Sequence, residues 1–162
     1  MFAKESAATV RLAVGFILDR YGDPALNPAD VAAVARTDPR QLEEFFILVY
    51  GIPVPGFINL FRTILAAECL LRRPSFALGR LRRVCGFASI DLFRTCFEHL
   101  LGQSPEEFVA RTRSLAAVDH EKVIDLMEYS VDVELLVGAM EKTETVLLEL
   151  MQEPDSPFYP GV

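Results

Sequence analysis

Six arginines in residues 72–94 are the side chains of this sequence best suited to bind an anion. A guanidinium carries a permanent positive charge and a planar fork of N–H donors that matches a phosphate. The surrounding segment, residues 60–113, holds nine Lys/Arg and five Asp/Glu, a net charge of +4. Such a cluster is either a solvated face or a phosphate-binding surface. The six residues are Arg72, Arg73, Arg80, Arg82, Arg83 and Arg94.

The rest of the chain is acidic. Residues 1–59 hold five basic and seven acidic residues, a net charge of −2, and residues 114–162 hold two and eleven, a net charge of −9. The net charge of −7 over 162 residues therefore comes mostly from the C-terminal segment. This asymmetry bears more directly on an anionic partner than the total does.

Other residues with chemical potential do not form a site. Cys96 and His99 have the spacing of metal ligands, but Cys96 falls on the apolar side of its predicted helix and no second pair completes a tetrahedral set. The sequence has no glycine-rich phosphate loop, catalytic triad order or evident pair of carboxylates. We therefore expect a protein that is not an enzyme and that has no metal or other cofactor.

Composition favours a folded domain in the cytoplasm. Hydrophobic residues make up 51% of the chain, which is far from the composition of disordered proteins. No apolar run reaches the ~18 residues of a membrane span, and the first residues lack the apolar region of a signal peptide. The odd number of three cysteines indicates reduced, buried thiols.

Capping signals divide the sequence into helices. Asn27-Pro28, Asp38-Pro39 and Ser104-Pro105 each place a capping side chain before a proline, which is well tolerated at the first helical position. Apolar residues recur at helical spacing between such signals. The sequence therefore predicts an all-α fold with helices at about 6–21, 28–35, 39–50, 56–71, 76–85, 90–101 and 105–111.

The predicted helices form two similar halves. In each half a short helix, a tight turn and a longer helix that a glycine ends have the layout of a helix-turn-helix. The two ending glycines, Gly51 and Gly102, are 51 residues apart. A period this long that occurs twice indicates duplicated subdomains joined by the long helix at 56–71.

Residues Leu26 to Arg111 resemble the DNA-binding domain of the AraC/XylS family of bacterial transcription regulators. The family pattern of the second half is G-F, then F-x-x-x-F, then G-x-S-P-x-x-[YF], and the linker helix has R-x-x-x-A-x-x-x-L. The matching residues are Gly86, Phe87, Phe93, Phe97, Gly102, Ser104, Pro105 and Phe108, then Arg62, Ala66, Leu70 and Leu71, and in the first half Leu42, Phe46 and Gly51.

The resemblance implies two helix-turn-helix subdomains whose recognition helices enter successive major grooves, ~34 Å apart. Apolar residues anchor each recognition helix to its core, so the opposite face is left for DNA bases. The residues on those two faces, our predicted base contacts, are Arg40, Gln41, Glu43, Glu44, Ile90, Asp91, Leu92 and Thr95.

Several residues depart from the family pattern. Glu44 and Thr95 stand where arginine is common, and Ile47-Leu48 and Glu98-His99 stand where a basic pair usually meets phosphate. Arg82 replaces a residue that is usually small. Each lost phosphate contact lowers the slope of log binding constant against log salt concentration by ~0.9 in magnitude. These exchanges therefore weaken the expectation of DNA binding.

The domain boundary is expected near residue 115. Residues 1–115 would form the tandem helix-turn-helix domain, and residues 116–162 an acidic helical extension with a loose end. The extension carries an apolar stripe that needs a partner, either the body of the protein or a second chain in a homodimer. The stripe consists of Val133, Leu136, Val137, Met140, Leu147 and Leu150.

These observations lead to one principal hypothesis and two alternatives. The principal hypothesis is a cytoplasmic transcription regulator that binds double-stranded DNA through both recognition helices. The first alternative is a helix-turn-helix scaffold that serves as a protein-interaction module. The second is self-inhibition, in which the acidic extension covers the arginine cluster and mimics DNA.

Overall fold

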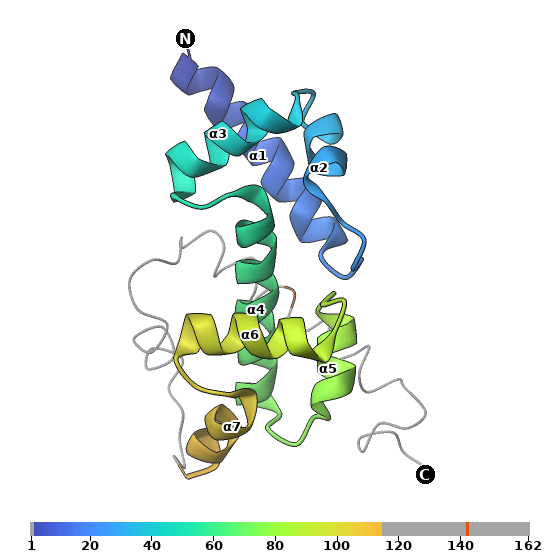
Figure 1. Ribbon diagram of the computed structural model, residues 1–162, viewed down its shortest axis with the longest axis vertical. Helices are drawn as coiled ribbons and strands as arrows, with labels where there is room; N and C mark the ends of the chain where they lie inside the picture. The colour runs from blue at the N-terminus through green and yellow to red at the C-terminus, as the bar shows by residue number, and fades with distance from the viewer. Residues whose placement is uncertain (1, 115–141, 143–162) are drawn as a thin grey trace. The chain divides into compact units, whose positions relative to one another are not determined.

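The computed structural model describes residues 2–114 and residue 142, and the part it describes is all-helical, as predicted (Figure 1). The chain divides into two compact units, Met1–Asn59 and Leu60–Val162, with the boundary inside the fourth helix. The helices are α1 (Phe2–Arg20), α2 (Pro28–Val34), α3 (Pro39–Tyr50), α4 (Val54–Arg72), α5 (Leu78–Val84), α6 (Ile90–Leu101) and α7 (Pro105–Ser114).

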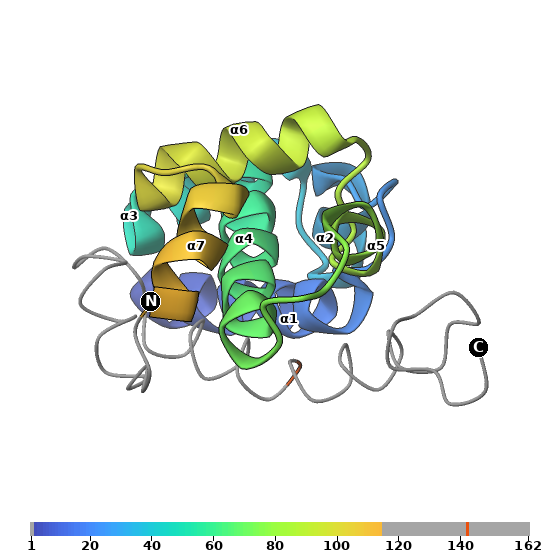
Figure 2. The ribbon, with the colours of Figure 1, turned by 90° about the horizontal axis from the view of Figure 1, so that it is seen from below.

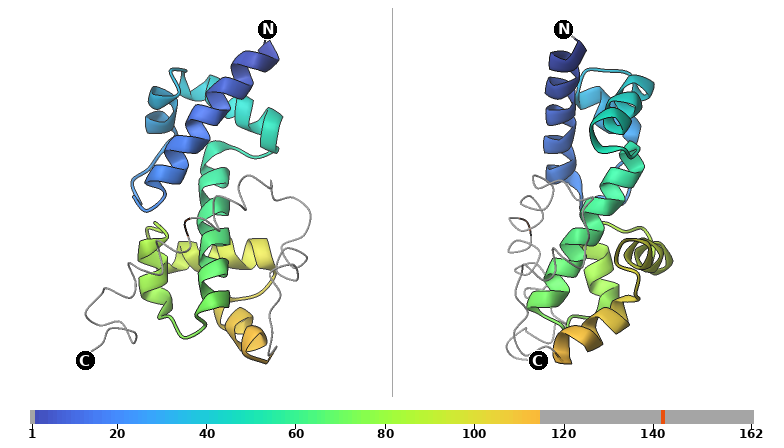
Figure 3. Two further views of the ribbon diagram at one scale, coloured as in Figure 1. Left: turned by 180° about the vertical axis from the view of Figure 1, so that it is seen from behind. Right: turned by 90° about the vertical axis from the view of Figure 1, so that its left-hand side faces the viewer.

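In the first unit, α1 packs along the pair formed by α2 and α3 (Figure 3). Ile17 of α1, Val31 of α2 and Leu42 of α3 are fully buried in the core between them. Phe46, Tyr50 and Phe57 form an aromatic cluster with ring centroids 4.8–5.5 Å apart, which joins the end of α3 to the start of α4. This core holds α3 by one side and leaves its other side exposed.

The second unit is built on the C-terminal half of α4, where residues 61–70 are all buried. Within this unit α6 crosses α4, with α5 beside one end of α6 and α7 beside the other (Figures 1 and 2). A run of phenylalanine contacts with centroids 5.2–5.7 Å apart connects the turn, α6 and α7 through Phe87, Phe93, Phe97 and Phe108. Helix α6 is therefore also anchored by one side.

The predicted capping side chains are confirmed. Backbone N–H groups of the first helical turns donate to the side-chain oxygens of Asn27 (3.1 Å) and Asp38 (3.0 Å). At the start of α7, Ser104 Oγ accepts from Glu107 N (3.1 Å) and Glu107 Oε2 accepts from Ser104 N (3.3 Å), which is a reciprocal capping box. These bonds satisfy N–H groups that have no partner inside the helix.

The internal repeat is confirmed in detail. The short helices α2 and α5 have 7 residues each, and the longer helices α3 and α6 have 12 each. Gly51 and Gly102 end α3 and α6 in the left-handed conformation, at φ 73° and 68°. The same helix lengths and the same ends show that both halves use one local design.

Four predicted helices have other bounds in the structure, and one of them is α7, which ends at Ser114 and not near Arg111. Helix α1 starts at Phe2, not near Ser6, and α5 spans Leu78–Val84, because residues 74–76 form a turn before it. Helix α4 starts at Val54, where we had expected a stiff connector to Gly56. Proline is tolerated in a first helical turn, so Pro55 did not prevent this earlier start.

Helix α4 has 19 residues and is long and apolar enough to cross a membrane by length and composition. Its apolar window is 72% buried inside the fold, and residues 61–70 include the buried Arg62 and Glu68. Helix α4 is therefore the core helix of the second unit.

Candidate nucleic-acid interface

The exposed face of α3 begins with a charge pair. Arg40 Nε lies 3.7 Å from Glu44 Oε1, one helical turn later, with the two side chains 91% and 64% exposed. Gln41 is also exposed, and its Oε1 accepts a hydrogen bond from Thr37 Oγ1 at 2.9 Å. Three of the four predicted base contacts of α3 thus lie on one exposed face, and the two charges on it offset each other.

Glu43 has a different position. Its side chain is half-buried, and Oε2 accepts a hydrogen bond from the backbone N–H of Val54 at 3.3 Å. Val54 is the first residue of α4, so this N–H has no partner within the helix. Glu43 therefore caps α4, and its predicted contact with a base stays a prediction that competes with this structural role.

The last turn of α3 exposes three consecutive apolar residues. Ile47, Leu48 and Val49 have exposed fractions of 52%, 67% and 49%. We had predicted from the sequence that Ile47 and Leu48 replace a phosphate-facing basic pair. Their side chains are accessible and cannot donate a hydrogen bond to a phosphate.

The face of α6 that lies away from the core is acidic. Ser89 caps the helix through a 3.1 Å bond from Leu92 N, and Asp91 and Thr95 are exposed. One further turn along, Glu98 and His99 are exposed as well. Ile90 and Leu92 are half-buried. The four predicted base contacts of α6 thus combine two exposed and two half-buried side chains, and Asp91 is the one charge among them.

Arg82, a predicted phosphate contact, is directed to the helix-turn-helix turn. Its Nη1 donates to the carbonyl oxygens of Phe87 (3.2 Å) and Ala88 (3.4 Å). The side chain is half-buried, in keeping with its place in the turn. A guanidinium that stabilises these carbonyls replaces the small residue usual at this position, so Arg82 has a structural role in this turn.

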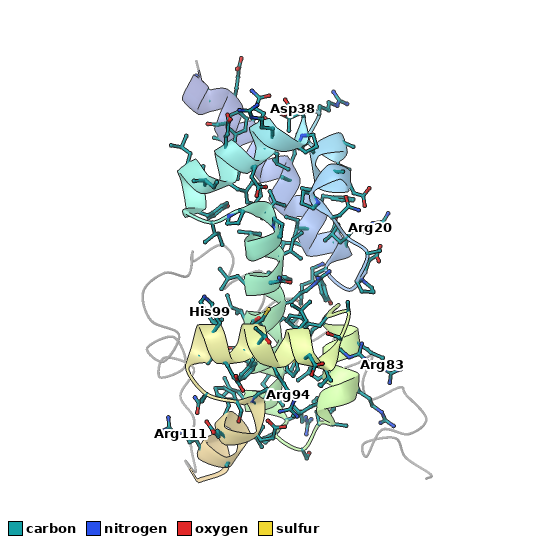
Figure 4. The ribbon with its side chains drawn as sticks, viewed as in Figure 1. Arg20, Asp38, Arg83, Arg94, His99 and Arg111 are labelled. Carbon is teal, nitrogen blue, oxygen red and sulfur yellow. The ribbon has the colours of Figure 1, made fainter. Side chains whose placement is uncertain are left out.

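Arg94, another predicted phosphate contact, forms an ion pair with Glu106 of α7. Nη1 donates to Oε2 at 2.8 Å, and Nη2 contacts Oε1. The hydrogen bond to Glu106 raises the pKa of Arg94, and the hydrogen bond from Arg94 lowers the pKa of Glu106. Figure 4 places Arg94 along the edge of α6 toward α7 and His99 on the opposite edge. The charge of Arg94 is thus partly offset within the fold.

The other four predicted phosphate contacts have mixed exposure. Arg73 and Arg83 are exposed, whereas Arg72 and Arg80 are half-buried. Arg83 projects outward from α5 in Figure 4. Among the six arginines, Arg83 combines an exposed side chain with a place on α5, so it is the best candidate of the cluster for a phosphate contact.

Two residues that matter to this surface were missed from the sequence. Arg36, in the turn between α2 and α3, is exposed and has φ 58°, a conformation that favours glycine. In the repeat it occupies the place of Gly86, so an alignment of the two halves would have drawn attention to it. Glu106 was missed because its partner Arg94 lies 12 residues away on another helix.

The described residues contain no group of three or more His, Cys, Asp and Glu side chains arranged to hold a metal. Burial raises the pKa of Cys96, and burial raises that of Cys69 to about 12, so both thiols are poorly ionised at neutral pH. The residues of the apolar stripe, Val133, Leu136, Val137, Met140, Leu147 and Leu150, lie outside the described residues.

Two solved structures resemble this fold. A transcriptional regulator from Chromobacterium violaceum with an AraC-type DNA-binding domain aligns with a TM-score of 0.59 at 24% identity, covering 66% of this chain and 94% of that one. The DNA-binding domain of AdpA, a global transcriptional factor solved with a target DNA, aligns with a TM-score of 0.59 at 23% identity, covering 67% and 96%. The chain has the AraC-type fold.

The AraC-type fold accounts for the paired helices of equal length and for α4 as their connection. No protein-family model matches the sequence, and no curated protein matches it.

Proposed function

We propose that this chain is a transcription regulator of the bacterial cytoplasm that binds double-stranded DNA through α3 and α6. The observation that carries the proposal is the fold: two capped recognition helices, each with one exposed face, in a domain that covers 96% of a structure solved with its target DNA. Fold alone does not imply function. The exposed residues of α3 and α6 must therefore indicate which side chains contact DNA.

Arg40 at the start of α3 is the residue best placed to read a base. Its guanidinium is 91% exposed, and arginine pairs with the O6 and N7 atoms of guanine in the major groove. Exposed ion pairs are weak, so Arg40 loses little free energy when it leaves Glu44 to contact a base. We assign phosphate contacts to the exposed Arg73 and Arg83.

A binding assay with a fluorescent random duplex tests this function. The full chain should bind at low salt, and Arg83→Gln should weaken binding and reduce the salt slope by ~0.9, since one phosphate contact is lost. Arg11→Gln on α1 is the matched control, because Arg11 is also exposed and its loss removes the same charge. Absence of binding at low salt, both by the full chain and by its variant E141Q/E144Q/E149Q, sinks the proposal.

A protein-interaction module is the second candidate function. The exposed apolar residues 47–49 and the acidic face with Asp91 and Glu98 favour it, because neither surface attracts phosphate. If the full chain does not bind duplex at low salt, Glu141, Glu144 and Glu149 can be changed together to Gln. Binding that appears only then supports self-inhibition by the extension, and continued absence supports the interaction module.

A further inference from the structure

The first unit contains a cavity beside the segment that connects α1 to α2. Its volume is about 360 Å³, and its lining comes from the end of α1, from the connecting segment and from α2, all within the first unit. Small-molecule sites in proteins have volumes of about 300–1,000 Å³. The cavity is therefore large enough for one small molecule.

One part of the cavity lining is apolar. Phe16 and Leu26 are half-buried, and Ala33 and Val34 are exposed. Such side chains leave apolar surface in contact with water, and a bound apolar group would remove that surface from water. This part of the cavity suits the apolar body of a ligand.

The same cavity carries one guanidinium group, that of Arg20. Figure 4 shows Arg20 at the end of α1, beside the segment that leads to α2. Its Cζ atom lies over the Phe16 ring, 5.9 Å from the ring centroid. This cation-π contact uses the face of the guanidinium, so the N–H groups at its rim can bind a carboxylate.

Two carboxylates complete the lining. Asp23 Oδ1 accepts a hydrogen bond from Ala25 N–H at 2.9 Å, and Asp30 Oδ2 accepts one from Asn27 Nδ2 at 2.9 Å. Because an ionised carboxyl group can accept about four hydrogen bonds, these contacts fix the direction of each carboxylate without using up its acceptor capacity. Two carboxylates in one cavity suit an ammonium group.

The internal repeat shows that the fold does not require these side chains. Helices α2 and α5 have the same length, and α5 begins without a side-chain cap. Where α2 has Asp30 and Ala33, α5 has Arg80 and Arg83. The carboxylate and the small side chain beside the cavity thus belong to the first unit and not to the shared helix-turn-helix design.

We propose that this cavity binds an apolar α-amino acid. Arg20 would pair with the carboxylate of the ligand, and Asp23 and Asp30 with its ammonium group. The side chain of the ligand would pack against Phe16 and Leu26. A ligand with a single charge would leave either the guanidinium or the carboxylates without a partner, so the site favours a zwitterion. The inference goes beyond DNA binding, because the cavity includes none of the residues assigned to a DNA contact.

A nuclear magnetic resonance titration of the full chain with L-phenylalanine tests the proposal. Backbone amide signals of residues 16–34 should shift with a Kd on the order of 1 mM, the affinity expected for a ligand of this size. Phenylpropanoate lacks the ammonium group and phenylethylamine lacks the carboxylate, so each should bind at least about tenfold more weakly. Equal binding of the three compounds, or no shifts in residues 16–34, overturns the proposal.

Arg20→Gln separates a contact with the ligand carboxylate from general damage to the cavity. It should weaken the binding of L-phenylalanine about tenfold and leave the binding of phenylethylamine unchanged. Arg11→Gln is the matched control, because Arg11 is also exposed on α1 and does not line the cavity. If Arg20→Gln weakens both ligands equally, or weakens neither, the proposal is wrong.

Two variants of α2 test the other side of the cavity. Ala33→Arg carries the residue that α5 has at the equivalent position, so the helix should persist and the shifts caused by L-phenylalanine should disappear. Asp30→Asn gives a test that does not depend on the folding of Ala33→Arg. It should weaken the binding of L-phenylalanine and phenylethylamine but not that of phenylpropanoate. Wild-type binding of L-phenylalanine by either variant contradicts the proposed site.

Discussion

Arg94 of α6 and Glu106 of α7 form a two-contact ion pair that joins the two helices. Nη1 donates to Oε2 at 2.8 Å. The rings of Phe97 and Phe108 also meet edge to face, with centroids 5.3 Å apart, so the two helices are joined by both charge and packing. Arg94 thus joins α6 to α7.

The pair should make stability depend on pH in the acid range. The hydrogen bond from Arg94 lowers the pKa of Glu106 from 4.5 in the folded state. The resulting stabilisation is complete above the unfolded pKa and is lost as the pH falls through the lower folded pKa. In urea unfolding, the wild type should have a higher free energy of unfolding than Glu106→Gln at about pH 7, and this difference should disappear toward about pH 3. A difference that does not change with pH would contradict this cause.

Releasing Arg94 should strengthen binding to random duplex. In Glu106→Gln the guanidinium loses its carboxylate partner, so its charge becomes available to phosphate, and the salt slope should rise by up to ~0.9. Glu107→Gln is the matched control, because it removes the same charge one residue away and glutamine can still complete the capping box with Ser104. Equal effects of the two variants would point to general repulsion and not to Arg94.

Removal of the Glu43 carboxylate should destabilise the fold. The bond from Val54 N–H to Glu43 satisfies the first turn of α4, and loss of a capping side chain costs about 1 kcal/mol. In chemical denaturation, the free energy of unfolding of Glu43→Ala should be about 1 kcal/mol lower than that of the wild type. Glu44→Ala, which breaks an exposed ion pair with Arg40, should stay within about 0.5 kcal/mol. If the two variants are equally stable, the capping role of Glu43 is wrong.

Arg36→Gly should stabilise the turn of the first helix-turn-helix. Arg36 has φ 58°, and Thr37 N donates to Ala32 O at 3.0 Å as Phe87 N does to Arg82 O at 3.0 Å beside Gly86. Glycine removes a side-chain clash worth about 1 kcal/mol in this conformation. Thermal and urea unfolding should show the gain. Arg36→Ala should show none, because alanine keeps the clash while it removes the same charge.

Local signals were sufficient for most of the fold. The caps at Asn27, Asp38 and Ser104 and the ends of α3 and α6 follow from neighbouring residues, because a capping side chain, a first-turn proline or a left-handed glycine acts within a few residues. The predicted start of α4 was wrong because the residue that caps it, Glu43, lies 11 residues away in the sequence. Its carboxylate accepts a hydrogen bond from Val54 N–H. An aperiodic contact of this kind has no local signature.

The sequence by itself determined the all-α fold, the two helix-turn-helix halves and the anchoring of each recognition helix by its apolar side. It could not determine what the charged side chains do, since partners far apart in sequence meet only when the helices pack. The tertiary structure alone decided that Arg94 is paired with Glu106 of α7 and that the carboxylate of Glu43 caps α4. Hydrogen bonds and ion pairs act over a few ångströms, and only packing brings these groups to that distance.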